Sequence, residues 1–298
     1  HAYKNVTGNA AEESRNLLVH DGWQHIVELD DKGAIQRRHT VAASEANAVH
    51  RLRTAVDRTG RRYFLGWSLL SRGVVVLDDH WQTVCTYPAE DARHGGIQAA
   101  DIGDLDGDGT LEFCVSFANK PEAGGGGLTG THCVAMDGQP LWRERDSGSA
   151  ISLTRAVDQS GGRFLMATTE AGRIVPIDAA GITQQPIQVG SRAIHQLFAS
   201  DANDPSSVFC GFTIFPNGEM LALAMDGDFS ERWGFLFPAG RFRNQIEFVT
   251  TAKWFENALW WLMAGADGSV SLVSHDGKFE DRFQVGYELS GIAAYRSG

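Results

Sequence analysis

The sequence predicts an all-β protein, a six-bladed β-propeller built from four-stranded antiparallel blades. Three observations support this fold class. An apolar strand that ends in Asp and a turn recurs six times, at spacings of roughly 40 to 60 residues, the period of a propeller blade. Two further strand patterns precede five of these repeats, and the two ends of the chain carry complementary parts of the remaining blade.

The recurring element is predicted to be the hairpin between the third and fourth strands of each blade. Its clearest example reads VAMDGQPLW and ends at Trp142, with β-prone residues on both sides of an Asp-Gly turn. Since Gly is 34 of 298 residues and Pro only 8, the glycines favour tight turns over a disordered linker. The six aspartates are Asp30, Asp78, Asp137, Asp178, Asp226 and Asp276.

The first and second strands of each blade precede these hairpins. The second strands are predicted to begin at Arg61, Leu111, Arg163, Ser207 and Leu259. Four of the five first strands end in an aspartate, and these are Asp57, Asp104, Asp158 and Asp201. The four-strand unit is therefore repeated along the chain.

The chain ends complete the sixth blade. The N-terminus supplies three strands without a first, and the segment 289–295 supplies a first strand without its followers, so pairing of the two ends is predicted to close the ring. We expect one domain, residues 1–298. Its blades are 288–298 with 14–41, 48–87, 95–145, 150–189, 193–236 and 244–286. A β-sandwich or solenoid would need a coincidental period, and a seventh blade would have to fit into the one long spacing, whose extra stretch is Gly-rich.

Composition restricts the partners. The net charge of −11 argues against general binding of nucleic acid, and no run approaches the roughly 18 apolar residues of a membrane span. We expect a soluble monomer. The chain begins at His1 without Met, which fits a processed or an excised chain.

The four cysteines lack the spacing of zinc-ribbon, thioredoxin-like or c-type haem motifs. They are Cys85, Cys114, Cys133 and Cys210. Cys114 and Cys133 lie on adjacent predicted strands of one blade. Because their register is open at this point, they are either a cross-strand disulfide or two buried thiols.

The most specific chemistry lies in the run D-L-D-G-D-G-T-L-E, from Asp104 to Glu112. Carboxylates alternate at Asp104, Asp106 and Asp108, and Glu112 follows at the ninth position. Hard oxygen donors around a tight turn are what Ca²⁺ requires. A plain Asp-Gly hairpin turn is the alternative, although an empty loop would hold four carboxylates in mutual repulsion.

The run from Ile97 to Phe117 resembles an FG-GAP (VCBS-type) repeat, a calcium-bearing propeller blade. The resemblance implies side-chain oxygens from the four acidic residues just named and a backbone carbonyl from Thr110. It also implies a structural role for Ca²⁺ and an extracellular or periplasmic location. The hairpins resemble PQQ-type propeller repeats, which occur in quinone-dependent dehydrogenases and in cofactor-free scaffold propellers; no vicinal cysteine pair favours the quinone.

The second candidate site is predicted on the opposite face, where the first strands begin. Arginine forks there suit an anionic ligand such as an acidic glycan, or a protein partner, whereas solvated arginines on the rim are the alternative. Paired imidazoles could hold a metal or transfer protons, or simply fill the channel with hydrogen bonds. The candidate ligand-binding residues are His50, Arg93, His94, Arg192, His195, Arg241 and Arg243.

The function expected from these features is a calcium-stabilised binding or scaffold module. The alternative is a carbohydrate-active enzyme, a polysaccharide lyase or glycosidase, with its site among the same Arg and His residues. Whether the chain is catalytic stays open, because propeller enzymes assemble their sites from distant strands.

Overall fold

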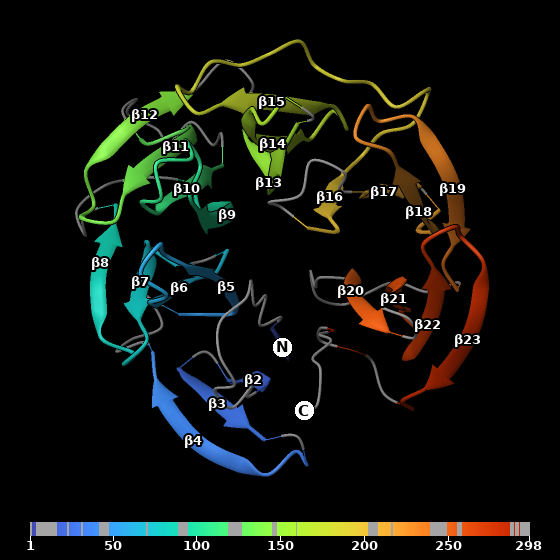
Figure 1. Cartoon of the computed structure of the whole chain (residues 1–298), viewed down its shortest axis with the longest axis horizontal. Coiled ribbons are helices and arrows are strands. Elements are labelled where there is room, and N and C mark those ends of the chain that lie inside the picture. The colour runs from blue at the N-terminus through green and yellow to red at the C-terminus, as the bar shows by residue number, and fades with distance from the viewer. Residues whose placement is uncertain are drawn as a thin grey trace.

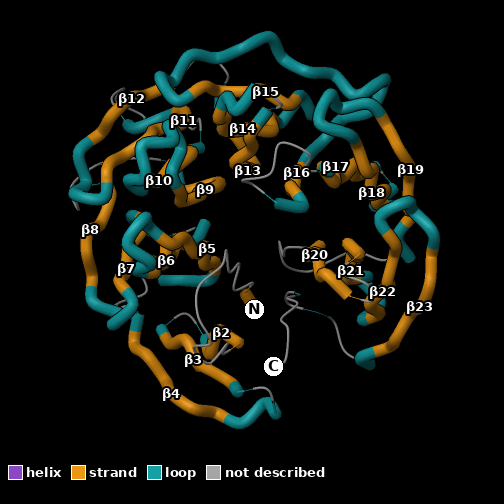
Figure 2. The backbone as a smooth tube through the Cα atoms, viewed as in Figure 1, coloured by secondary structure: helices purple, strands orange, loops and turns teal. Residues whose placement is uncertain are grey.

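The computed structural model confirms the six-bladed propeller: six antiparallel sheets surround a common axis (Figure 1). It describes residues 2–3, 17–22, 24–30, 32–41, 48–69, 71–88, 95–118, 127–144, 148–158, 160–201, 208–215, 217–238, 249–254, 258–286, 289 and 292. Strands and loops make up all of these residues (Figure 2). Within them, no helix is long and apolar enough to cross a membrane.

The strands follow the chain from the axis outwards in each blade. Blade 1 holds β1 (Ala2–Tyr3), β2 (Leu17–Asp21), β3 (His25–Leu29) and β4 (Ile35–Thr40). Blade 2 holds β5 (Arg51–Val56), β6 (Arg62–Trp67), β7 (Val74–Asp78) and β8 (Thr83–Tyr87). Blade 3 holds β9 (Ile97–Gly103), β10 (Glu112–Phe117), β11 (Gly130–Ala135) and β12 (Pro140–Glu144).

The second half of the ring repeats this order. Blade 4 holds β13 (Ala150–Val157), β14 (Arg163–Thr169) and β15 (Ile174–Asp178). Blade 5 holds β16 (Gln196–Ala199), β17 (Phe209–Ile214), β18 (Met220–Met225) and β19 (Glu231–Leu236). Blade 6 holds β20 (Val249–Trp254), β21 (Ala258–Ala264), β22 (Ser269–Ser274) and β23 (Phe279–Gln284).

Blade 4 lacks a regular outer strand. Only single bridges continue its sheet, from Ile177 to Thr183 and from Ile174 to Ile187. The intervening segment contains Pro186, which has no N–H to donate to a ladder. The outer edge of this blade is therefore an irregular segment.

The first blade differs from the expectation in one respect. Its innermost strand is β1, close to the N-terminus, so the N-terminal segment supplies a first strand of its own. Pairing of the C-terminal segment with this blade stays a prediction, because residues 290–291 and 293–298 lie outside the described part of the chain. Leu289 and Ile292 pack against the apolar cluster between blades 5 and 6.

One turn geometry explains three of the six hairpin aspartates, Asp30, Asp78 and Asp178, whereas at Asp137 and Asp276 the turn begins two residues earlier, at Ala135 and Ser274. In the turn that starts at Asp178, the Gly181 N–H donates to the Asp178 carbonyl at 2.9 Å, and Gly181 has a φ of 80°. The Asp178 carboxylate accepts the N–H groups of Ala180 and Ile182 at 3.0 and 2.9 Å. The same two contacts recur at Asp30, Asp57, Asp78 and Asp158. Asp therefore satisfies turn amides that the hairpin leaves unpaired, and Gly supplies the left-handed residue.

The core consists of five apolar clusters, one at each junction from blades 1 and 2 to blades 5 and 6. Two junctions also share an outer contact. Trp142 Nε1 donates to the Ala179 carbonyl of the next blade at 2.9 Å, and Trp233 Nε1 donates to the His275 carbonyl at 2.9 Å. Each indole therefore joins its outer strand to the hairpin turn of the following blade.

Candidate functional site

The Asp104 loop joins β9 to β10, where the sequence predicts a calcium site. One carboxylate oxygen from each of Asp104, Asp106 and Asp108 lies within 4.8 Å of the others. Gly107 and Gly109, with φ of 87° and 85°, let the backbone turn tightly between them. The loop thus brings three of the predicted ligands together.

Glu112, at the start of β10, is the fourth acidic residue. Its side chain is buried, and its Oε2 accepts the Leu105 N–H at 2.8 Å. Burial, together with the negative charges of the three loop aspartates, raises the pKa of Glu112 to about 7. A cation would offset this charge, so the donor set fits Ca²⁺.

Two arginines lie beside the loop. Arg163 Nη1 donates to the Asp104 carbonyl at 2.7 Å and lies 3.5 Å from Asp104 Oδ2. Arg58 packs against Gly109, where an added Cβ would lie 3.1 Å from Arg58 Cδ. Part of the loop's negative charge is therefore balanced by the protein itself.

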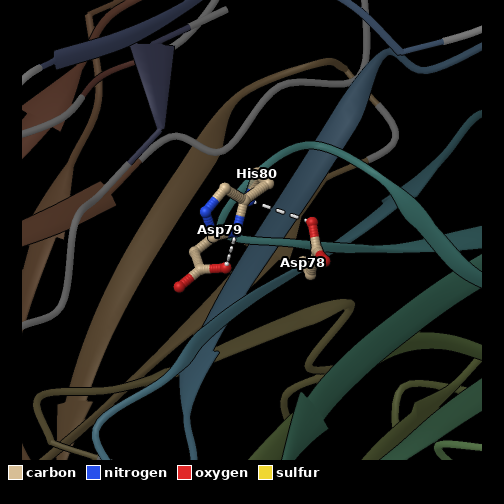
Figure 3. A group of neighbouring side chains, drawn as sticks. All are labelled: Asp78, Asp79 and His80. Carbon is tan, nitrogen blue, oxygen red and sulfur yellow. Dashed lines mark hydrogen bonds and ion pairs between the residues drawn. The ribbon is translucent and has the colours of Figure 1, made fainter.

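A second group of ligand-type side chains is found in the β7–β8 turn: Asp78, Asp79 and His80 (Figure 3). His80 Nδ1 lies 2.7 Å from Asp79 Oδ1, and the His80 N–H donates to Asp78 Oδ1 at 2.9 Å. The Arg61 guanidinium pairs with Asp78 Oδ2 at 2.7 Å and with Asp79 at 3.5 Å. An arginine therefore already offsets part of the negative charge of this group.

The predicted histidines are held within separate blades. His50 Nδ1 is hydrogen-bonded to Ser68 Oγ at 3.0 Å in blade 2, and His195 Nδ1 accepts the Ile214 N–H at 3.2 Å in blade 5. Partial burial lowers the pKa of both imidazoles. Blades 2 and 5 lie on opposite sides of the ring (Figure 1), so the two imidazoles belong to blades that are not adjacent.

The predicted arginines are placed only in part. Arg192, on the connection between blades 4 and 5, has its Nε 3.6 Å from Glu231 Oε2 at the start of the outermost strand β19. It therefore lies towards the rim and is paired with a carboxylate. The other four candidates lie outside the described residues: Arg93, His94, Arg241 and Arg243.

Sequence reasoning missed the charged residues of the innermost strands. Asp101 of β9 is buried and lies 3.2 Å from Arg155 Nε of β13 and 4.0 Å from Arg53 Nε of β5. One carboxylate thus links three blades. The alternation of Arg51 and Arg53 in a predicted first strand is the signal that could have indicated cations at the axis.

Hydroxyl groups of the innermost strands also reach neighbouring blades. Thr154 Oγ1 of blade 4 donates to the Leu197 carbonyl of blade 5 at 2.6 Å, and Thr251 Oγ1 of blade 6 donates to the Ser200 carbonyl at 3.4 Å. Together with Asp101, these side chains hold the inner ring together.

No protein-family model matches the sequence, and no curated protein sequence matches it. Many solved structures are similar to this chain in fold, BamB and BBS1N among them. BamB from Moraxella catarrhalis has a TM-score of 0.50 at 16% identity, over 94% of this chain and 74% of that one. BBS1N, solved in complex with ARL6DN, has a TM-score of 0.62 at 9% identity, over 93% and 80% of the two chains. At these identities the similarity concerns the fold alone.

Proposed function

We propose that the chain is a calcium-stabilised, extracytoplasmic propeller that acts as a binding or scaffold module for a protein partner. The observation that carries the binding role is the contrast between axis and rim. Polar side chains such as Asp101 and Thr154 are bonded between blades at the axis, whereas large apolar side chains are exposed on the outer strands.

The exposed apolar side chains are concentrated on blades 5 and 6. We call Leu236, Phe279, Phe283 and Val285 the rim patch; their exposed fractions are 58%, 51%, 47% and 48%. Phe279 also stacks on Phe235 of blade 5, with ring centroids 6.4 Å apart and planes at 9°, so one member of the patch lies at the junction of the two blades. Each outer edge of blades 1 to 4 contributes one such residue among those described, and these are Ile35, Val84, Leu141 and Ile182.

An apolar rim favours a protein partner over an anionic glycan, because clustered exposed apolar side chains are typical of protein interaction sites. The BBS1N propeller, which was solved with ARL6DN, supports this interpretation by analogy of fold. An acidic glycan would instead require arginine forks, and Arg192 is already paired with Glu231.

The test is site-specific photo-crosslinking in the native host. A photoreactive phenylalanine analogue replaces Phe283 in the rim patch, and Val84, which is similarly exposed on β8, serves as the matched control. We expect a discrete protein adduct from position 283 and none from position 84. Equal labelling at both positions, or a ligand captured only on a glycan array, would contradict the protein-binding role.

The calcium part of the proposal is supported by the Asp104 loop. Asp104, Asp106, Asp108 and Glu112 would supply side-chain oxygens, and Thr110 its carbonyl; the bound ion would supply positive charge beside the buried Glu112. The extracytoplasmic location is supported by this metal, since extracellular calcium is abundant enough to fill a weak structural site.

Calcium titration by calorimetry tests this part. We expect saturable heat and a raised melting temperature with Ca²⁺, both lost in the Asp106→Asn/Asp108→Asn variant. Asp79→Asn is the matched control, because its carboxylate already pairs with Arg61. If the wild-type protein gave neither heat nor a thermal shift with Ca²⁺, the calcium site would be refuted. The carboxylates of the loop would then be balanced by the neighbouring arginines alone.

A further inference from the structure

Two cysteines lie face to face in blade 3. Cys114 of β10 is the direct cross-strand partner of Cys133 of β11, in a ladder without irregularity from Glu112 to Phe117. Directly opposed residues in antiparallel strands have Cα atoms about 4.5 or 5.5 Å apart. Disulfides span Cα distances of about 4.4 to 6.8 Å, so the register permits a bond without strand slippage.

The surroundings of the two thiols single them out. Both are buried in the apolar cluster between blades 3 and 4, and the Cys114 thiol is hydrogen-bonded to Cys133. Cys85 belongs to blade 2 and Cys210 to blade 5, so each of these thiols lies in a different blade from the pair. Of the four cysteines, only Cys114 and Cys133 therefore share a blade.

We propose that Cys114 and Cys133 form an intrachain disulfide when the protein folds under oxidising conditions. The two thiols lose two protons and two electrons as the sulfur–sulfur bond forms. A small disulfide such as oxidised glutathione accepts them and is released as two thiols. The occurrence of the bond in the cell rests on the extracytoplasmic location proposed above.

The cross-link would join the two strands that flank the longest connection in blade 3. The segment between β10 and β11 covers residues 118–129 and is rich in Gly, so joining its two ends costs conformational entropy. A disulfide between the flanking strands removes part of that cost from the unfolded chain. Glu112 lies two residues before Cys114, on the same face of β10, so the bond would also fix a proposed calcium ligand.

The experiment is refolding of the full chain in a glutathione redox buffer that contains EDTA, followed by alkylation in denaturant and peptide mapping. We expect two alkylated cysteines, Cys85 and Cys210, and a cross-linked peptide pair containing Cys114 and Cys133. Reductant should lower the melting temperature by roughly 5 °C or more. The shift should disappear in Cys114→Ala/Cys133→Ala and persist in Cys85→Ala/Cys210→Ala.

Four alkylated cysteines after oxidative refolding, or pairing of Cys114 with another cysteine, would overturn the proposal. Because EDTA is present, a failure of calcium binding leaves this result unaffected. A bond that forms in the refolding buffer but is reduced in protein isolated from its host would count against the extracytoplasmic location and not against the pairing.

Discussion

Gly103 is expected to be intolerant of even one added methyl group, because the Arg155 guanidinium occupies that space. A Cβ at Gly103 would lie 1.8 Å from Arg155 Nη1, 2.3 Å from Cζ and 2.6 Å from Nε. All three atoms belong to the group that pairs with Asp101. The Gly103→Ala change therefore forces the guanidinium away from a buried carboxylate.

The magnitude follows from two contributions. Displacing Arg155 weakens the 3.2 Å contact between its Nε and Asp101, and a hydrogen bond to a charged group contributes about 1.5 to 3 kcal/mol. Inserting a methyl group into packed structure adds about 1 to 3 kcal/mol. Asp101 retains the Arg155 backbone N–H at 3.2 Å, so a total near 3 kcal/mol is expected, which is about 5 °C in melting temperature for a chain of this length.

The assay is urea unfolding of a double-mutant cycle. Gly103→Ala should cost about 3 kcal/mol in the wild-type background and less than about 1 kcal/mol in Arg155→Ala, where the space is empty. Gly234→Ala is the matched control, since its added Cβ would meet Leu221 at an ordinary 3.4 Å. An equal cost of Gly103→Ala in both backgrounds would refute the reasoning, because the added methyl group would then not displace the Arg155 guanidinium.

Two further predictions concern Glu112 and the blade 5–6 junction. The raised pKa of Glu112, about 7 against 4.5, means that the metal-free folded protein binds this proton more tightly than the unfolded chain. This proton contributes about 3 kcal/mol to the free energy of unfolding below pH 4.5, and the contribution is lost as the pH rises through 7. In urea unfolding with EDTA, the free energy of unfolding of the wild type should therefore fall more steeply with rising pH than that of Glu112→Gln. Parallel pH profiles of the two proteins would contradict the prediction. At the junction, a Cβ on Gly277 would lie 2.3 Å from Trp233 Cγ, and Gly277 has a φ of 87°, where any side chain is strained. Gly277→Ala should therefore lower the melting temperature by roughly 5 °C, and Trp233→Ala should remove only the part of this loss that comes from the contact with the indole. If the changes in melting temperature of Gly277→Ala and Trp233→Ala simply added in the double variant, the packing of the indole against Gly277 would be refuted.

The local parts of the fold could be predicted from the sequence because they depend on neighbouring residues. An Asp such as Asp178 that caps its own turn amides and a Gly such as Gly181 in the left-handed region mark hairpins without any knowledge of the rest of the chain. Their spacing then gives the blade count. The Asp104 loop was located for the same reason, since its three aspartates are close in sequence as well as in space.

The candidate ligand face could not be predicted with equal accuracy, because it depends on where side chains from different blades point. Arg192 was assigned to the face where the first strands begin, and in the structure it pairs with Glu231 of the outermost strand β19. The twist of a sheet turns its outer strand away from its inner one, and sequence spacing does not record that rotation. For β1, a strand of two residues is too short to show a period.

Blade 3 combines several stabilising contacts, and its connectivity gives a reason. It contains the Asp104 loop, the opposed Cys114 and Cys133, and His132, whose Nδ1 accepts a 2.7 Å hydrogen bond from Tyr87 Oη of blade 2. The same blade carries the long segment between β10 and β11, whose closure costs more entropy than the tight turns elsewhere. Cross-links close to this segment offset the entropy lost on closing it. The proposed Ca²⁺ ion and the proposed disulfide should therefore stabilise blade 3 together, and removing both should lower the free energy of unfolding by more than the sum of removing each, because either one alone would still hold β10 in register.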